Sequence, residues 1–187
     1  MIFFKNRLRV LIVFPLLAIL ASCNGRLEDS SGISGIGDSG LIGTWRFVSM
    51  KARSPRGEAI YPYGEHIYGR LIYTTEGLTS VLLMNPDRPK FASDDPLAGT
   101  PEEIEAAYRG FDAYCGSFTV DENRATVTHH IRASKFPNWI GTDQVRSFEI
   151  QDNRLKLKAD IETRGEVWKF EADLERVLPE TSDRNRV

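Results

Sequence analysis

The stretch that decides the fold is residues 41–53, which read LIGTWRFVSMKAR. Side chains alternate between the two faces of an extended chain, so Trp45 and Phe47 share one face while Arg46 lies on the other. Such alternation is typical of a β-strand with one buried face. We therefore expect a strand over 42–53 whose Trp45 and Phe47 side chains point into a core.

Seven further stretches have the same strand character and end at turn residues. They are 66–74, 78–84, 115–120, 124–134, 143–150, 154–160 and 166–177. Short polar or glycine-bearing connections, such as 74–77, 121–123 and 151–153, are typical of hairpins. Successive hairpins form an antiparallel meander, and eight strands are enough to close into a barrel that holds one small ligand. The sequence thus predicts an all-β, eight-stranded antiparallel up-and-down barrel.

One helix interrupts the series of strands. Thr100, Pro101 and Glu103 supply an N-cap, a proline at the first helical position and a glutamate at the third, which are the elements of a capping box. Its apolar face would comprise Ile104, Ala107, Tyr108 and Phe111. The preceding residues 85–99 carry three prolines and do not suit a strand. We expect an inserted helix over about 101–113 that acts as a lid across one barrel mouth.

The N-terminus has the pattern of an export signal. Its first nine residues contain three basic residues and no acidic one, and 11–20 is apolar except for a proline. This apolar run is about half the length of a transmembrane helix, which favours cleavage over retention. Residues 20–23, Leu-Ala-Ser-Cys, resemble the bacterial lipobox. We expect a lipoprotein signal peptide over 1–22 and a diacylglycerol on Cys23; an ordinary cleaved signal or a cytosolic chain are the alternatives.

Removal of residues 1–22 would leave 165 residues, the size of one domain. Residues 23–40 are rich in glycine and serine and predict a flexible tether, followed by the barrel over 41–178 and a disordered tail over 179–187. The signal takes three of the 24 basic residues and none of the 26 acidic ones, so the mature net charge is −5. Such a charge offers no basic field for nucleic acid. The predicted location is the bacterial cell envelope, and Asn24 is compatible with the outer membrane.

The two cysteines do not predict an internal disulfide. Cys23 is the lipidation candidate, which leaves Cys115 without an intrachain partner. Free cysteines are usually buried small apolar residues, and this is the expected role of Cys115, with a reactive thiol as the alternative.

Two separated motifs resemble those of lipocalins. Gly43-Thr44-Trp45 resembles the Gly-x-Trp element that opens a lipocalin, and Leu174-Glu175-Arg176 falls where the last lipocalin strand supplies an arginine over that tryptophan. The resemblance implies that Trp45 and Arg176 close one end of the barrel. Further segments resemble uncharacterised bacterial and fungal lipocalin-like domains. They are 69–73, 91–93, 98–104, 114–116, 128–130 and 136–139. Lipocalin folds mostly carry small hydrophobic molecules, and a few relatives catalyse cyclisation.

Strand parity selects the candidate lumen residues. His129 shares a face with Val127 and Ile131, and Arg146 shares one with Phe148 and Ile150. The candidate ligand contacts are Arg146, His129, Tyr73, Phe148, Trp168 and Phe170. The polar ones would orient an acidic or polar head group in an apolar lumen. The alternative is that Arg146 pairs with an internal glutamate or with backbone carbonyls and that His129 is a satisfied core residue.

The residues offer little support for metal or covalent chemistry. His129 and His130 are adjacent on a strand and point to opposite faces, so they cannot bind one ion together. No nucleophile motif surrounds the serines or Cys115, and we assign no catalytic residue, metal or cofactor. The expected function is carriage of a small hydrophobic ligand, with an acid–base isomerase or cyclase using His129 with Tyr73 or Tyr114, or a ligand-free envelope interaction module, as alternatives. Residues 136–139 would cap the lumen or, as we favour, pack against the helix at Tyr108 and Phe111, and the two roles are compatible.

Overall fold

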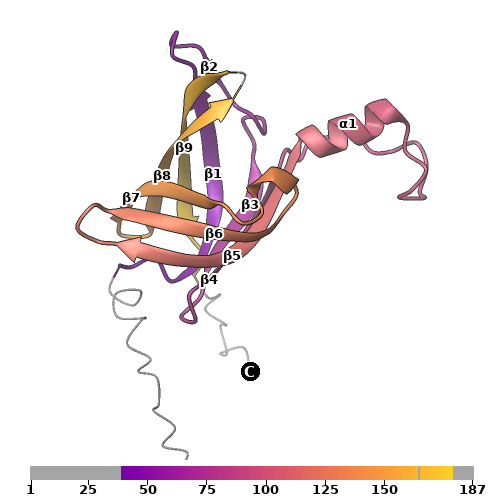
Figure 1. Ribbon diagram of the computed structural model, residues 1–187. Coiled ribbons are helices and arrows are strands. Elements are labelled where there is room, and N and C mark those ends of the chain that lie inside the picture. The colour runs from indigo at the N-terminus through magenta and orange to yellow at the C-terminus, as the bar shows by residue number, and fades with distance from the viewer. Residues whose placement is uncertain (1–38, 164, 179–187) are drawn as a thin grey trace, which may run out of the picture. The chain divides into compact units, whose positions relative to one another are not determined.

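The fold is a closed antiparallel β-barrel, seen in a computed structural model that describes residues 39–163 and 165–178. Apart from the short β2, each strand pairs with the strands before and after it in the chain, and β9 returns to pair with β1 (Figure 1). The barrel strands are β1 (Gly43–Arg53), β3 (Tyr68–Tyr73), β4 (Leu78–Met84), β5 (Phe111–Asp121), β6 (Thr126–Ser134), β7 (Asp143–Gln151), β8 (Arg154–Thr163) and β9 (Glu166–Arg176). The two-residue β2 (Ala59–Ile60) pairs antiparallel with the C-terminal end of β1. The predicted eight-stranded fold is confirmed.

The predictions for both termini concern residues outside the described part of the chain. The signal peptide 1–22, Cys23, most of the tether and the tail 179–187 all fall there. In the part of the chain that is described, no helix is long and apolar enough to cross a bilayer.

The inserted helix is shorter than expected, and the strand after it is longer. α1 (Pro101–Arg109) begins with the predicted capping box, in which Thr100 and Glu103 bond each other's backbone N–H groups. Gly110 ends it, and the Gly110 N–H donates to the Ala106 carbonyl. The chain is extended from Phe111 onward, so the prediction of helix over 101–113 was wrong in its last turn. The consequence is that Asp112 belongs to β5 and faces the inside of the barrel.

The prediction that this helix is a lid was also wrong. None of its residues is buried, Ile104 is 53% exposed, and the helix extends away from the barrel (Figure 1). Its last turn is held at the barrel end, where Lys135 donates to the Tyr108 carbonyl at 2.7 Å and Arg88 donates to the Ala107 carbonyl at 3.1 Å. Both contacts engage carbonyls at the C-terminal end of the helix. The rest of this nine-residue helix therefore projects from that anchored end.

Cys115 is exposed, so its expected burial was wrong. Parity decides this, because Asp112, Tyr114 and Phe118 of β5 face inward and the odd-numbered Cys115 faces out. The residue that follows is constrained by a bulge between β5 and β6. A Cβ on Gly116 would lie 1.9 Å from the His130 carbonyl oxygen, so only glycine fits this close backbone approach.

One end of the barrel is closed by the pair that the lipocalin resemblance singled out. Trp45 is fully buried, and its indole N–H donates to the Leu41 carbonyl at 2.7 Å. The Arg176 guanidinium lies 4.1 Å from the Trp45 ring centroid and donates to the carbonyls of Ile42 and Gly40. Gly43 has φ of +131°, and a Cβ there would meet this guanidinium at 2.8 Å. The glycine of the Gly-x-Trp element thus makes room for Arg176.

Candidate functional site

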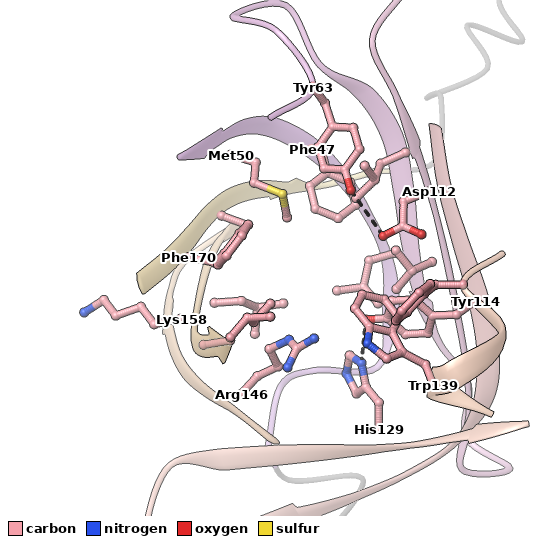
Figure 2. Close-up of a pocket in the computed structure, with 18 of the residues that line it drawn as sticks. Phe47, Met50, Tyr63, Asp112, Tyr114, His129, Trp139, Arg146, Lys158 and Phe170 are labelled. Atoms are coloured by element: carbon pink, nitrogen blue, oxygen red, sulfur yellow. Dashed lines mark hydrogen bonds between the residues drawn. The ribbon is translucent and has the colours of Figure 1, made fainter. Parts of the chain in front are cut away.

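The barrel encloses a cavity of about 330 Å³ at the end away from Trp45. Its walls are mostly apolar, and a few polar side chains reach into it (Figure 2). The apolar lining residues include Phe47, Met50, Leu71, Val81, Leu83, Leu157, Ala172 and Phe170, and the polar ones include Arg146, Asp112, His129, Tyr114 and Tyr63. This is the composition of a small-molecule site, in which apolar walls supply affinity and a few polar groups set orientation.

Arg146 reaches the cavity from β7, as strand parity predicted. Its guanidinium donates to the Val145 carbonyl at 3.0 Å and hydrogen-bonds the Tyr114 hydroxyl. Across the described residues, no carboxylate lies within ion-pair distance of it; every ion pair found involves other side chains. A half-buried guanidinium without a carboxylate retains donor capacity for an oxygen ligand.

His129 is buried in the cavity wall between two tyrosines. The Tyr73 hydroxyl lies 2.7 Å from its Nε2, and the Tyr114 hydroxyl lies 2.9 Å from its Nδ1. Burial lowers the His129 pKa to about 3, and the positive charge of Arg146 acts in the same direction. The ring is therefore neutral at pH 7, with both nitrogens already engaged. The hydrogen bond from His129 orients the Tyr114 hydroxyl beside Arg146. Its other partner, Tyr73, is buried in the barrel wall.

This depressed pKa predicts an acid-sensitive fold. In the unfolded chain His129 takes up a proton near its ordinary pKa of 6.5, whereas the folded protein resists protonation until about pH 3. Stability is therefore lost as pH falls through this window, by about 2 kcal/mol between pH 7 and pH 5. Glutamine has an amide that both donates and accepts hydrogen bonds but does not titrate. We therefore expect His129→Gln to lose this pH-dependent part of the unfolding free energy. Urea unfolding at the two pH values measures the difference.

Asp112 and the outward-facing His130 bear on the interpretation of that measurement. Burial raises the Asp112 pKa, so this group adds stability as pH falls, but it does so in the wild type and in the variant alike. His130→Gln is the matched control, because His130 lies on the outer face. Equal pH slopes for the wild type and His129→Gln would contradict the assignment.

Asp112 and Tyr63 form a polar pair that sequence reasoning missed. Asp112 is 8% exposed, and its Oδ2 accepts a hydrogen bond of 3.2 Å from the Tyr63 hydroxyl. Burial raises the pKa of this carboxyl, while the nearby Lys135 and Arg146 oppose the rise. The pair was missed because 112 was assigned to the helix. Gly110 is the signal that would have ended the helix earlier and placed Asp112 on the inward face of a strand.

The remaining predicted contacts divide into two groups. Phe170 lines the cavity, whereas Tyr73, Phe148 and Trp168 do not belong to its lining. Tyr73 and Trp168 are buried in the barrel wall, and Phe148 packs against the core. Parity identified the inward face correctly for all of them. It could not tell which inward side chains lie at the level of the open space along the barrel axis.

Phe136 and Trp139, around the short helix η1 (Pro137–Trp139), line the cavity mouth. The Trp139 ring packs edge-on against Tyr114 and Phe136, with centroid separations of 5.8 Å in each case. The segment thus borders the lumen, one of the two compatible roles expected for it. The neighbouring Lys135 contacts α1, with its ammonium nitrogen 4.0 Å from the Tyr108 ring centroid.

The titratable groups of the cavity do not form a metal site. In the part of the chain with described coordinates, no three His, Cys, Asp or Glu side chains are close enough to hold one ion. His129 and His130 point to opposite faces, with His130 bound on the outside to Asp143 at 2.7 Å.

Comparison with known proteins agrees with this architecture. A family described as a lipocalin-like domain matches residues 42–174. The chain is also 38% identical over 84 residues to a 4'-hydroxy-3'-methoxypropiophenone carrier protein of Aspergillus oryzae, a match that covers 42% of this chain and 76% of the relative. Because the family match spans the barrel from its first strand to its last, the chain belongs to the lipocalin-like domain family.

Proposed function

We propose that this protein carries a small, largely apolar molecule in the barrel lumen and holds a carbonyl or carboxylate oxygen of that molecule on Arg146. The family and the named relative support ligand binding or carriage in general. The observation that carries the specific proposal is a guanidinium at the wall of an apolar cavity of about 330 Å³ that has no carboxylate partner among residues 39–163 and 165–178. Burying such a charge is costly unless a ligand oxygen compensates for the lost water.

An aryl ketone is the ligand class that we favour. The Aspergillus relative is named for carrying a propiophenone, an aromatic ring with a ketone. The cavity here is at the small end of the usual range of ligand sites, about 300–1,000 Å³, which suits a compact ring better than a long chain. Phe47 and Phe170 in its walls offer aromatic surfaces for such a ring.

The two alternative functions fit the cavity less well. A ligand-free interaction module would fill the barrel with its own side chains, whereas here open space remains. An acid–base isomerase needs a group whose pKa lies near the working pH. His129, with a pKa of about 3 and both ring nitrogens occupied, is poorly suited to exchange protons at pH 7.

Arg146→Leu tests the head-group contact. A hydrogen bond to a charged group contributes about 1.5–3 kcal/mol, so we expect affinity for 4'-hydroxy-3'-methoxypropiophenone to fall about 10- to 100-fold. Isothermal titration calorimetry measures this change. Arg154→Leu is the matched control, because Arg154 lies on the outer surface of β8. Unchanged affinity in Arg146→Leu would contradict the proposed contact, and mass spectrometry of organic extracts from the purified protein would reveal the natural ligand.

We also propose that the chain is exported and held at a bacterial envelope membrane by lipid on Cys23. The support is the sequence of residues 1–23, with its basic start, short apolar run and terminal Leu-Ala-Ser-Cys. The first barrel strand begins at Gly43, twenty residues beyond Cys23. A glycine- and serine-rich spacer of this length would let the barrel present its open mouth to the aqueous phase.

A further inference from the structure

Among the polar groups that line the cavity, Arg146 and Asp112 have opposite character and lie on different walls. Arg146 on β7 is a donor, and it meets the Tyr114 hydroxyl beside it. Asp112 on β5 is an acceptor, and it is held by Tyr63 from the connection between β2 and β3. Figure 2 shows Arg146 and Asp112 on different sides of the cavity, whose other lining residues are mostly apolar.

The Asp112 carboxylate still has capacity to bind a ligand. Its Oδ2 accepts from Tyr63, and its Oδ1 accepts from the Ala113 backbone N–H at 3.0 Å. A carboxylate has about four acceptor sites, so two bonds leave it under-satisfied. Lys135 contributes charge at the rim but donates to the backbone carbonyls of Tyr108 and Phe111, not to this carboxylate. A buried carboxylate in this state is best satisfied by another donor from inside the cavity.

We infer that the Asp112 carboxylate, held by Tyr63, forms a subsite for a hydrogen-bond-donating hydroxyl, so the lumen selects aromatic ketones that also carry a phenolic hydroxyl. The ketone oxygen would face Arg146 and Tyr114, and the hydroxyl would donate to Asp112. This inference rests on the proposed carrier function and narrows its ligand class. Simple fatty acids are disfavoured, because their single polar group can satisfy only one position and their chain would then desolvate the other.

Two matched probes test the subsite. They are 4'-hydroxy-3'-methoxypropiophenone and 3'-methoxypropiophenone, which lacks only the hydroxyl. A site built around a hydroxyl discriminates strongly against the analogue without it, because its polar group is then buried without a partner. We expect the wild type to bind the hydroxylated probe at least about tenfold more tightly in calorimetric titrations. Asp112→Asn should reduce this preference severalfold, and Asp112→Leu should abolish it while keeping affinity for 3'-methoxypropiophenone.

Tyr63→Phe separates recognition from a purely structural role of Asp112. This variant loses the 3.2 Å bond but retains the carboxylate, so the preference for the hydroxylated probe should persist or increase. Equal binding of the two probes by the wild type, or an undiminished preference in both Asp112 variants, would overturn the subsite and leave the carrier proposal standing. Binding of neither probe would contradict both proposals.

Discussion

Replacing Trp45 with alanine is expected to lower the free energy of unfolding by about 3–5 kcal/mol, a large share of the stability of a single domain. The indole is fully buried at the closed end of the barrel, where it packs in the core with Leu41, Leu174 and their neighbours. Its removal would leave a cavity in the core. The Leu41 carbonyl would lose its hydrogen-bond donor, and the Arg176 guanidinium would lose the aromatic ring over which it lies. Chemical denaturation at pH 7 measures the loss.

Trp139→Ala is the matched control for this prediction. Trp139 has the same side chain but lies half-buried at the open mouth, where neighbouring space already reaches the lumen. We expect its replacement to cost much less stability than that of Trp45, because little new cavity surface is created. If the two alanine variants lost similar amounts of stability, the closed end would not be the tightly packed structural element that its contacts indicate.

Replacing Cys23 with serine is expected to move the protein from the membrane fraction to the soluble fraction. A thiol is needed to attach the diacylglyceryl group, and a serine cannot supply it. Each buried methylene contributes about 0.8 kcal/mol, so two acyl chains hold a protein firmly where one is marginal. Expression in a bacterial host with a fatty-acid label, followed by fractionation, measures both the attachment and the location.

Cys115→Ser is the control for that experiment. Cys115 is exposed on the outer face of β5 and has no role in the expected lipidation, so this variant should keep its label and its membrane association. The Cys23→Ser barrel should also keep its ligand affinity, because the cavity is built from residues 47–172. Label that remains on Cys23→Ser, or is lost from Cys115→Ser, would contradict lipidation at Cys23.

The hydrogen bonds of His129 contribute to the stability of the fold and also fix the geometry of the candidate site. His129 has one tyrosine on each nitrogen, and the Tyr114 hydroxyl then meets Arg146. A guanidinium only donates hydrogen bonds, so the Tyr114 oxygen accepts from it. The buried chain thereby positions the donor side of the cavity before any ligand arrives. Such preorganisation reduces the ordering that binding would otherwise require.

Local sequence patterns predicted the inward face of each strand well. Arg146, His129 and Phe170 were all placed toward the lumen from parity, and each lines the cavity. Parity succeeds because the alternation of side chains is a property of the extended backbone itself. Cys115 shows what happens when this rule is set aside, because its burial was expected from residue type and its parity directed it outward.

The end of the helix and the contacts between distant segments were harder to predict from the sequence. Asp112 was missed because the helix ends at Arg109, before Gly110, whereas the apolar pattern continues to Phe111. The helix was expected to cover the mouth, but Arg88 and Lys135 anchor its last turn to the barrel end. These contacts join segments distant in sequence, so no short window of residues contains them.

The sequence by itself determined the strand alternation and the meander order, because strand period and hairpin turns are set by neighbouring residues. The pairing of Trp45 with Arg176 at the closed end was implied by the resemblance to lipocalins. Only the tertiary structure decided the depth at which each inward side chain meets open space. That depth depends on strand register and curvature around the whole barrel, which brings Asp112 of β5 and Arg146 of β7 to one cavity while Phe148 packs into the core. Register is a collective property of all the strand pairs in a closed sheet, so it emerges only when the sheet closes.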